Sequence, residues 1–133
     1  MSAPAITIEG LVKGYGGQAV LDSLDLAVQA GETVGLVGVN GAGKTTLIRC
    51  LLDFCPVDEG RITLFGREHR APAARARLAY LPERFQPPWF ATGAEFVRYV
   101  TGLHGTGVPE ADLQAAAENL DLAPAALAQP VRT

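Results

Sequence analysis

The sequence has few of the features that mark secreted, membrane-spanning or disulfide-rich proteins. Only two cysteines, Cys50 and Cys55, occur among the 133 residues, and no histidine or further cysteine stands near them at metal-ligand spacing. We expect both to be small buried thiols rather than a disulfide or a metal pair. No run approaches the roughly 18 apolar residues of a membrane-spanning helix. The N-terminus MSAPAITIEG has neither the basic start nor the apolar core of a signal peptide.

An excess of charge of either sign is also lacking. The formal net charge is −3, and the 11 basic residues form no long block, which argues against a nucleic-acid partner. The arginine-rich stretch 67–77 is expected to be a solvated loop or short helix, with His69 facing solvent as His104 does. The 48% hydrophobic content is typical of a soluble globular domain. Together these features predict a cytoplasmic protein.

Hydrophobic periodicity in the first half predicts mainly strands. Alternating and β-branched residues predict strands at 5–13 and 19–28, joined by a glycine turn into an antiparallel pair. The apolar run 33–39 is typical of a strand buried on both faces of a parallel sheet. The segments 61–65 and 78–81 also have strand character.

Helical periodicity predicts the remaining elements. One helix is expected from about Lys44 to Phe54. A capping box at Thr92–Glu95 predicts the start of a second, Pro109 suits the first turn of a third, and a further helix is expected to start at Pro124. Residues 1–133 are expected to form one partial domain with three parts, namely an antiparallel β layer (5–30), an α/β core portion (31–85) and a helical portion (86–133).

The segment 38–45, GVNGAGKT, satisfies G-x-x-x-x-G-K-[ST] between an apolar run and a periodic helix. Its glycines allow backbone N–H groups to point into one concavity, and the helix N-terminus favours a phosphate. A lysine has no use in a mere turn, so we predict that the chain binds a nucleoside triphosphate. Lys44 is expected to reach the β- and γ-phosphates, and the Thr45 hydroxyl to ligate Mg²⁺. The predicted nucleotide-contacting residues of this phosphate loop are Gly38, Asn40, Gly41, Ala42, Gly43, Lys44, Thr45 and Thr46.

From Ile6 to its end, the sequence resembles the nucleotide-binding domain of ATP-binding cassette (ABC) transporters. The stretch LVKGYGGQAVLDSLDLAVQAGETVGLVGVNGAGKTTL is similar to that family's opening, and GRITLFGRE to its second β segment. The resemblance implies an α/β P-loop NTPase fold with an antiparallel β layer and a helical subdomain, incomplete at the C-terminus. It implies ATP and Mg²⁺ as cofactors, and it assigns adenine stacking to Tyr15; alone, this residue would be interpreted as a strand-end aromatic.

The segment LAYLPERF resembles the link between the ATPase core and the helical subdomain, where the family usually has glutamine after Leu-Pro. Here the residue is Glu83, which cannot donate a hydrogen bond while ionised. The resemblance implies a catalytic and Mg²⁺-contacting role for Glu83 and favours an export partner; the alternative is a surface carboxylate. Trp89 and Phe90 follow in a proline-rich loop. They are expected either to contact a transmembrane partner or to pack in a small satellite core.

Several family motifs cannot be placed in this sequence, including the signature, the strand ending in Asp-Glu and the switch histidine. Asp53, expected on the helix after the loop, faces the wrong way for Mg²⁺. Lys44 and the loop therefore predict that the chain binds a nucleotide. The chain alone is expected to be inactive in hydrolysis, because these other motifs are needed for it. Its unpaired apolar strand 33–39 predicts marginal stability or aggregation.

The resemblance implies the ATP-binding half of a subunit that couples ATP hydrolysis to transport by a membrane permease. It implies a second such domain in a head-to-tail dimer and a peripheral position at the inner face of the membrane. A non-hydrolysing ATP-binding module that docks on a permease or on a partner ATPase is the alternative. A P-loop kinase fits the loop but not the Tyr15 layer.

Overall fold

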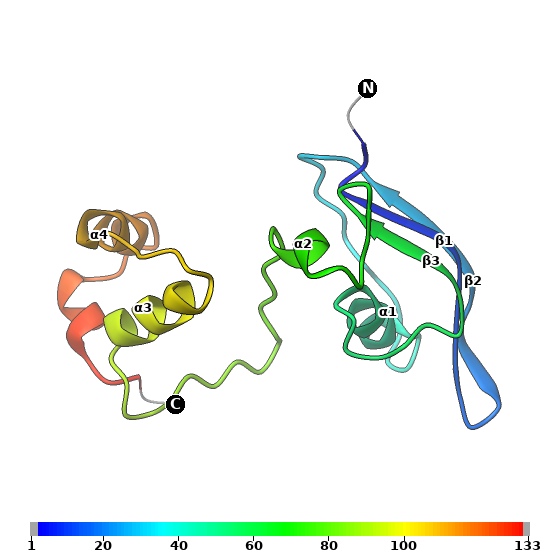
Figure 1. The fold of residues 1–133 in the computed structure, drawn as a ribbon. Helices are drawn as coiled ribbons and strands as arrows, with labels where there is room; N and C mark the ends of the chain where they lie inside the picture. The colour runs from blue at the N-terminus through cyan, green and yellow to red at the C-terminus, as the bar shows by residue number, and fades with distance from the viewer. Residues whose placement is uncertain (1–2, 132–133) are drawn as a thin grey trace. The chain divides into compact units, whose positions relative to one another are not determined.

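A computed structural model describes residues 3–131, and the chain divides into two compact units, Met1–Ala79 and Tyr80–Thr133. The first unit carries the sheet and the second is helical (Figure 1). Within residues 3–131, no helix combines the length and the apolar character needed to cross a bilayer. The elements are β1 (Ile6–Tyr15), β2 (Gln18–Val28), α1 (Lys44–Leu51), β3 (Glu59–Leu64), β4 (Arg67–Glu68), α2 (Pro72–Arg75), α3 (Gly93–Leu103), α4 (Glu110–Asn119) and a 3-10 helix, η1 (Pro124–Ala128).

The sheet of the first unit is antiparallel, in the order β2-β1-β3-β4. The predicted hairpin forms, with Tyr15 opposite Gln18 at its tip and Ile6 opposite Val28 at its base. Strand β3 pairs with the other edge of β1, although the two strands are separated by the whole segment that carries the phosphate loop. Strand β1 is thus the central strand on which the unit is organised.

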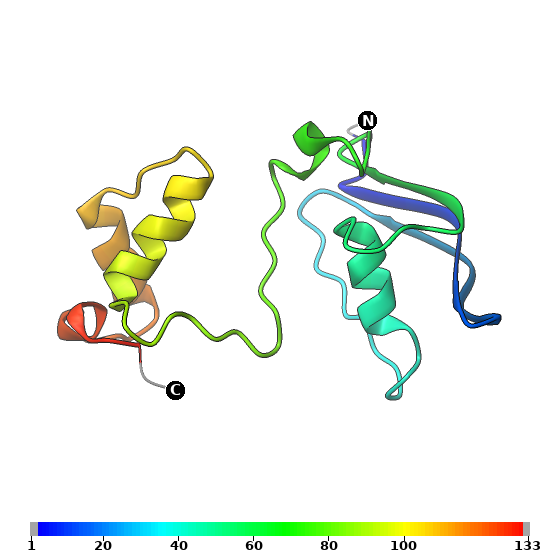
Figure 2. The same cartoon turned by 60° about the horizontal axis from the view of Figure 1, so that its bottom comes forward.

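Helix α1 packs against one face of this sheet, as the two views of the unit show (Figure 2). Its Leu47 and Cys50 are buried against the sheet residues Leu21 and Ile62. Burying a leucine side chain contributes about 1.5–3 kcal/mol relative to leaving it exposed. The remaining buried members of this core cluster are Ile8 and Leu11. The helix that follows the phosphate loop is therefore fixed by hydrophobic burial along one face.

Two predicted strands are absent. Residues 33–39 and 78–81 have no strand pairing within the described chain. Val37 is 93% exposed and Val39 78% exposed, although both belong to the apolar run that predicted a buried strand. A strand requires a hydrogen-bonded neighbour, and here the sheet ends at β2 on one edge and at β4 on the other. Residues 33–39 therefore have the apolar composition of a buried strand but, among the described residues, no neighbouring strand to pair with.

The second unit consists of α3, α4 and η1. Thr92 caps α3 through the predicted box: its side chain accepts a hydrogen bond from the Glu95 amide, and the Glu95 side chain accepts one from the Thr92 amide. Arg98 of α3 forms an ion pair with Glu110 of α4. Leu113 and Ala117 of α4 are buried. The predicted helix starts near residues 92, 109 and 124 are thus confirmed, the last as a 3-10 turn.

Candidate functional site

The phosphate loop forms an exposed turn between Val39 and the start of α1. Gly41 and Gly43 both have φ of +86°, a conformation that residues with a Cβ adopt only with strain. The Ala42 amide donates to the Val39 carbonyl at 3.2 Å, which closes the turn. At Gly43 the chain enters α1, whose first backbone bond runs from the Leu47 amide to the Gly43 carbonyl at 2.8 Å.

Gly43 also lies close to the sheet. A Cβ at this position would stand 2.9 Å from the Val20 carbonyl oxygen and 3.0 Å from Leu21 Cδ2. Both distances are shorter than an ordinary van der Waals contact. Glycine at position 43 therefore allows the loop to turn and also allows α1 to start directly against β2.

Lys44 spans the loop with its side chain. Its Nζ donates to the Gly38 carbonyl at 2.6 Å and to the Val39 carbonyl at 2.8 Å. The ammonium is thus held above the turn by oxygens of the loop itself, in a half-buried position at the first residue of α1. Because the two acceptors are neutral carbonyls, the ammonium keeps its full positive charge. An anion that binds at the loop is therefore attracted by that charge.

The first turn of α1 contains no acidic residue, and within residues 3–131 no side chain caps the helix. The first amides of an α-helix have no intrahelical partner, and together with the helix dipole they favour an anion. Thr45 is exposed and Thr46 half-buried in this first turn. The cradle of loop amides, Lys44 and the threonine hydroxyls therefore fits a phosphate group with a bound hard cation.

Tyr15 ends β1, and its side chain is half-exposed. Lys13 Nζ lies 5.3 Å from the ring centroid, within the range of a cation–π contact. A hydrogen bond with the Cys55 thiol, followed by partial burial, raises the pKa of the Tyr15 hydroxyl. The ring is thus held at the strand end from two sides.

Sequence reasoning missed the residues that fix this strand end. The Asp58 carboxylate accepts hydrogen bonds from Lys13 Nζ at 2.7 Å and from the Gly14 amide at 2.8 Å. Because Lys13 and Asp58 are 45 residues apart, no local spacing could have indicated the pair. The hydrogen bond to Asp58 raises the pKa of Lys13, and the hydrogen bonds from Lys13 and Gly14 lower the pKa of Asp58.

Glu83 belongs to the second unit, where it is exposed in a segment without regular structure. Its assignment to the nucleotide site therefore rests on the sequence. Trp89 and Phe90 are 76% and 71% exposed and meet edge to face, with ring centroids 5.8 Å apart. Phe90 also lines an open groove of about 580 Å³ in the second unit.

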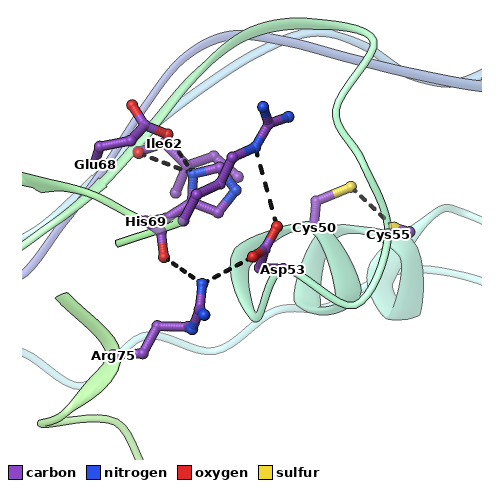
Figure 3. A network of polar contacts seen from close by, with 8 residues as sticks. Cys50, Asp53, Cys55, Ile62, Glu68, His69 and Arg75 are labelled. Atoms are coloured by element: carbon purple, nitrogen blue, oxygen red, sulfur yellow. Dashed lines mark hydrogen bonds and ion pairs between the residues drawn. The ribbon is translucent and has the colours of Figure 1, made fainter. Parts of the chain in front are cut away.

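The prediction for His69 was wrong, whereas His104 is exposed as predicted. His69 is only 1% exposed, and its Nδ1 lies within hydrogen-bond distance of the Ile62 carbonyl and the Glu68 carboxylate (Figure 3). Arg75 donates to the His69 carbonyl at 2.8 Å and to the Asp53 carboxylate at 2.9 Å. Asp53 follows the end of α1 instead of lying on it, with φ of +60°. Arg70 and Arg75 thus pair with Asp53, which follows α1 and is distant in sequence, so the local sequence does not indicate this contact.

The chain matches the family model described as "ABC transporter" over residues 21–131. It is 46% identical over 77 residues to a Nod factor export ATP-binding protein of Ralstonia nicotianae, covering 58% of this chain and 24% of that protein. It is 37% identical over 127 residues to a daunorubicin resistance ATP-binding protein of Streptomyces coeruleorubidus, covering 92% and 40%. A zinc import ATP-binding protein of Pseudomonas entomophila is 41% identical over 86 residues, covering 65% and 30%.

Solved structures give the same result for the fold. A bacterial Atm1-family ABC exporter with ATP bound superposes with a TM-score of 0.78 at 29% identity, covering 97% of this chain and 23% of that one. A putative ABC transporter ATP-binding protein of Pyrococcus furiosus also gives 0.78, at 24% identity, covering 89% and 57%. The chain spans well under half the length of the curated relatives named above. By its family match and its P-loop fold, the chain belongs to the ABC transporter family.

Proposed function

We propose that this chain is the ATP-binding portion of an ABC transporter ATPase. The observation that carries the proposal is Lys44, held across the phosphate loop by the Gly38 and Val39 carbonyls at the uncapped N-terminus of α1. This arrangement presents one positive charge and several backbone donors at a single exposed turn. The ATP-binding names of the relatives support the same ligand.

Each residue type of the loop has a role toward ATP and Mg²⁺. The backbone amides of residues 40–46 hold phosphate oxygens, and Lys44 offsets their charge. The Thr45 hydroxyl is the proposed Mg²⁺ ligand. The bond cleaved in hydrolysis is the phosphoanhydride bond of the bound ATP. Tyr15 is proposed to stack on the adenine ring, since its side chain is half-exposed at the strand end. Glu83 is proposed to contact Mg²⁺ or its water in the complete protein.

In the complete protein, we propose that ATP binding and hydrolysis drive a membrane permease. The domain then works in a head-to-tail dimer at the cytoplasmic face of the membrane, with the second unit docked on the permease and Trp89 and Phe90 in the contact. Export is the proposed direction. Relatives named for Nod factor export and daunorubicin resistance support it, while the zinc import relative shows that the family match alone does not fix it.

Titration of the chain with a fluorescent ATP analogue and Mg²⁺ tests the proposal. Replacing Lys44 by Ala removes a charged hydrogen-bond donor, and we expect a loss of about 1.5–3 kcal/mol in binding, roughly ten- to a hundredfold in Kd. Arg49→Ala is the matched control, because Arg49 is an exposed cation in the last turn of the same helix. Equal affinities of wild type and Lys44→Ala would contradict the assignment. Hydrolysis that disappears in Lys44→Ala would exclude the non-hydrolysing module.

Tyr15 is tested in the same assay with two substitutions. Tyr15→Ala removes the ring, and we expect weaker binding by about 1–3 kcal/mol if the ring stacks on the base. Tyr15→Phe retains the ring and is expected to bind like wild type. An unchanged Kd for Tyr15→Ala would return this residue to a purely structural role at the strand end.

A further inference from the structure

The two cysteines form a close pair at the end of α1 that faces away from the phosphate loop. Cys50 is completely buried in the core cluster, and Cys55 packs against that cluster from outside. The two sulfur atoms are 3.5 Å apart (Figure 3). Both thiols are free. No other pair of thiols exists in the sequence.

The turn that brings Cys55 back over Cys50 is held at several points. The Phe54 amide donates to the Arg49 carbonyl at 2.8 Å, and Asp53 adopts φ of +60°, which reverses the chain. Arg75 of α2 holds the Asp53 carboxylate at 2.9 Å. Pro56 restricts Cys55 to extended backbone. The short sulfur–sulfur distance therefore follows from a turn fixed by backbone, ion-pair and proline constraints.

The two thiols differ in access. Cys55 is partly exposed and Cys50 is fully buried, so Cys55 is the more accessible of the two to a small solute. Its neighbours include the Tyr15 hydroxyl, whose pKa is raised by a hydrogen bond with Cys55. Burial and the hydrogen bond with Cys55 raise the pKa of Cys50 to about 12. Cys55 is thus the thiol that meets an oxidant, and Cys50 stays protonated beneath it.

We propose that Cys50 and Cys55 are a redox modification site that forms a reversible intramolecular disulfide on reaction with hydrogen peroxide. The Cys55 thiolate attacks one peroxide oxygen, the O–O bond breaks, and the departing hydroxide takes up the proton released from the thiol, leaving a sulfenic acid and water. The Cys50 sulfur then attacks the Cys55 sulfur, and the S–O bond breaks. The Cys50 proton goes to the leaving oxygen, which departs as a second water. Two thiols and one peroxide give one disulfide and two waters.

The geometry favours the disulfide over further oxidation of Cys55. The sulfenic acid forms with its resolving thiol already in contact, so the sulfurs need to approach by only about 1.5 Å to reach a bond of roughly 2.0 Å. A buried partner also shields the product from water. The disulfide does not involve the phosphate loop, because the two cysteines lie at the opposite end of α1; their link to the proposed nucleotide site is the contact of Cys55 with Tyr15.

The experiment exposes the 133-residue chain to hydrogen peroxide and measures intact mass and free thiols. For wild type, we expect the loss of two hydrogen atoms, the loss of both free thiols together, and full recovery with dithiothreitol. Because the disulfide is intramolecular, the product is expected to run as a single chain on a denaturing, non-reducing gel. Cys55→Ser is the matched variant, since the substitution is at the partly exposed position; its buried Cys50 is expected to remain reduced under the same treatment.

Three results would overturn the proposal. One is the stable addition of oxygen atoms to Cys55 while Cys50 stays reduced. Another is a disulfide between two chains, and the third is no change in mass when free N-acetylcysteine is consumed under the same conditions. Because Cys50→Ser removes a core residue, the mass analysis relies on wild type and Cys55→Ser, whose folding is checked beforehand by circular dichroism.

Discussion

At the scale of single residues, two constraints meet at Gly43. It needs a positive φ of +86°, and a Cβ there would press on the Val20 carbonyl. We expect Gly43→Ala to lower the free energy of unfolding by about 1–3 kcal/mol, measured by urea denaturation. Gly31→Ala separates the causes, because Gly31 has φ of +81° with no atom within 4 Å of a built Cβ. Equal losses for the two variants would show that strain alone acts at Gly43.

Asp58 makes the stability of the first unit depend on pH. Hydrogen bonds from Lys13 and Gly14 lower the pKa of Asp58 from its ordinary 3.8. The ionised carboxylate therefore stabilises the folded state at pH values above 3.8, and this contribution is lost as pH falls through the lower folded pKa. We expect the urea midpoint of Asp58→Asn to lie below that of wild type at pH 7, with a smaller gap near pH 3. Asp22→Asn, at an exposed position of β2, is the control, and a gap for Asp58→Asn that stays constant with pH would contradict the assignment.

At the scale of the elements, local sequence was sufficient wherever a segment provides its own partners. The hairpin of β1 and β2 was predicted because alternation and a glycine turn act over neighbouring residues. The capping box at Thr92 was predicted for the same reason. The helix after the loop was also predicted, although α1 ends at Leu51 rather than near Phe54, since the chain reverses at Asp53.

Prediction failed where a feature depends on a distant segment. The apolar run 33–39 indicates a strand, but its pairing depends on neighbours that the run cannot specify. His69 is buried with its ring against the Ile62 carbonyl of β3, and Arg75 of α2 joins the His69 carbonyl to Asp53 after α1, contacts that local spacing does not indicate. Within the candidate site, the glycines and the lysine of the phosphate loop could be predicted from the sequence. The Lys13–Asp58 ion pair near Tyr15 could not, because its two residues are 45 positions apart.

The cap of α3 offers a test at this scale. Thr92→Ala removes the acceptor for the Glu95 amide, so we expect a loss of about 1 kcal/mol, measured as faster hydrogen exchange in the first turn of α3. Thr106→Ala is the matched control, because the Thr106 hydroxyl donates to the Thr101 carbonyl at 3.2 Å, near the end of α3 rather than at its start. Similar exchange in both variants would mean that the box does not hold the helix start.

At the scale of the whole molecule, exposed apolar surface is the main liability. Four apolar side chains of the 33–39 run are exposed, and they follow one another without a covering element in the first unit: Val34, Leu36, Val37 and Val39. Monomeric proteins rarely leave such a run uncovered. We therefore expect the isolated chain to self-associate at concentrations used for structural work.

Light scattering of a charged variant tests this expectation. Val37→Lys is expected to reduce self-association without lowering the urea midpoint, because Val37 is 93% exposed. Leu120→Lys places the same charge at an exposed apolar site of the second unit and is expected to have a smaller effect. A wild-type chain that stays monomeric and melts sharply and reversibly well above body temperature would contradict the expectation.

The pairing of β1 on both of its edges has a consequence for the motions of the unit. The segment from the end of β2 to the start of β3 contains the phosphate loop and α1, and both of its ends are tied to β1. Separating β1 from its neighbours would release both anchors at once. Opening of the sheet and loosening of the loop are therefore one cooperative event, and a ligand that holds the loop slows amide exchange in the central strand.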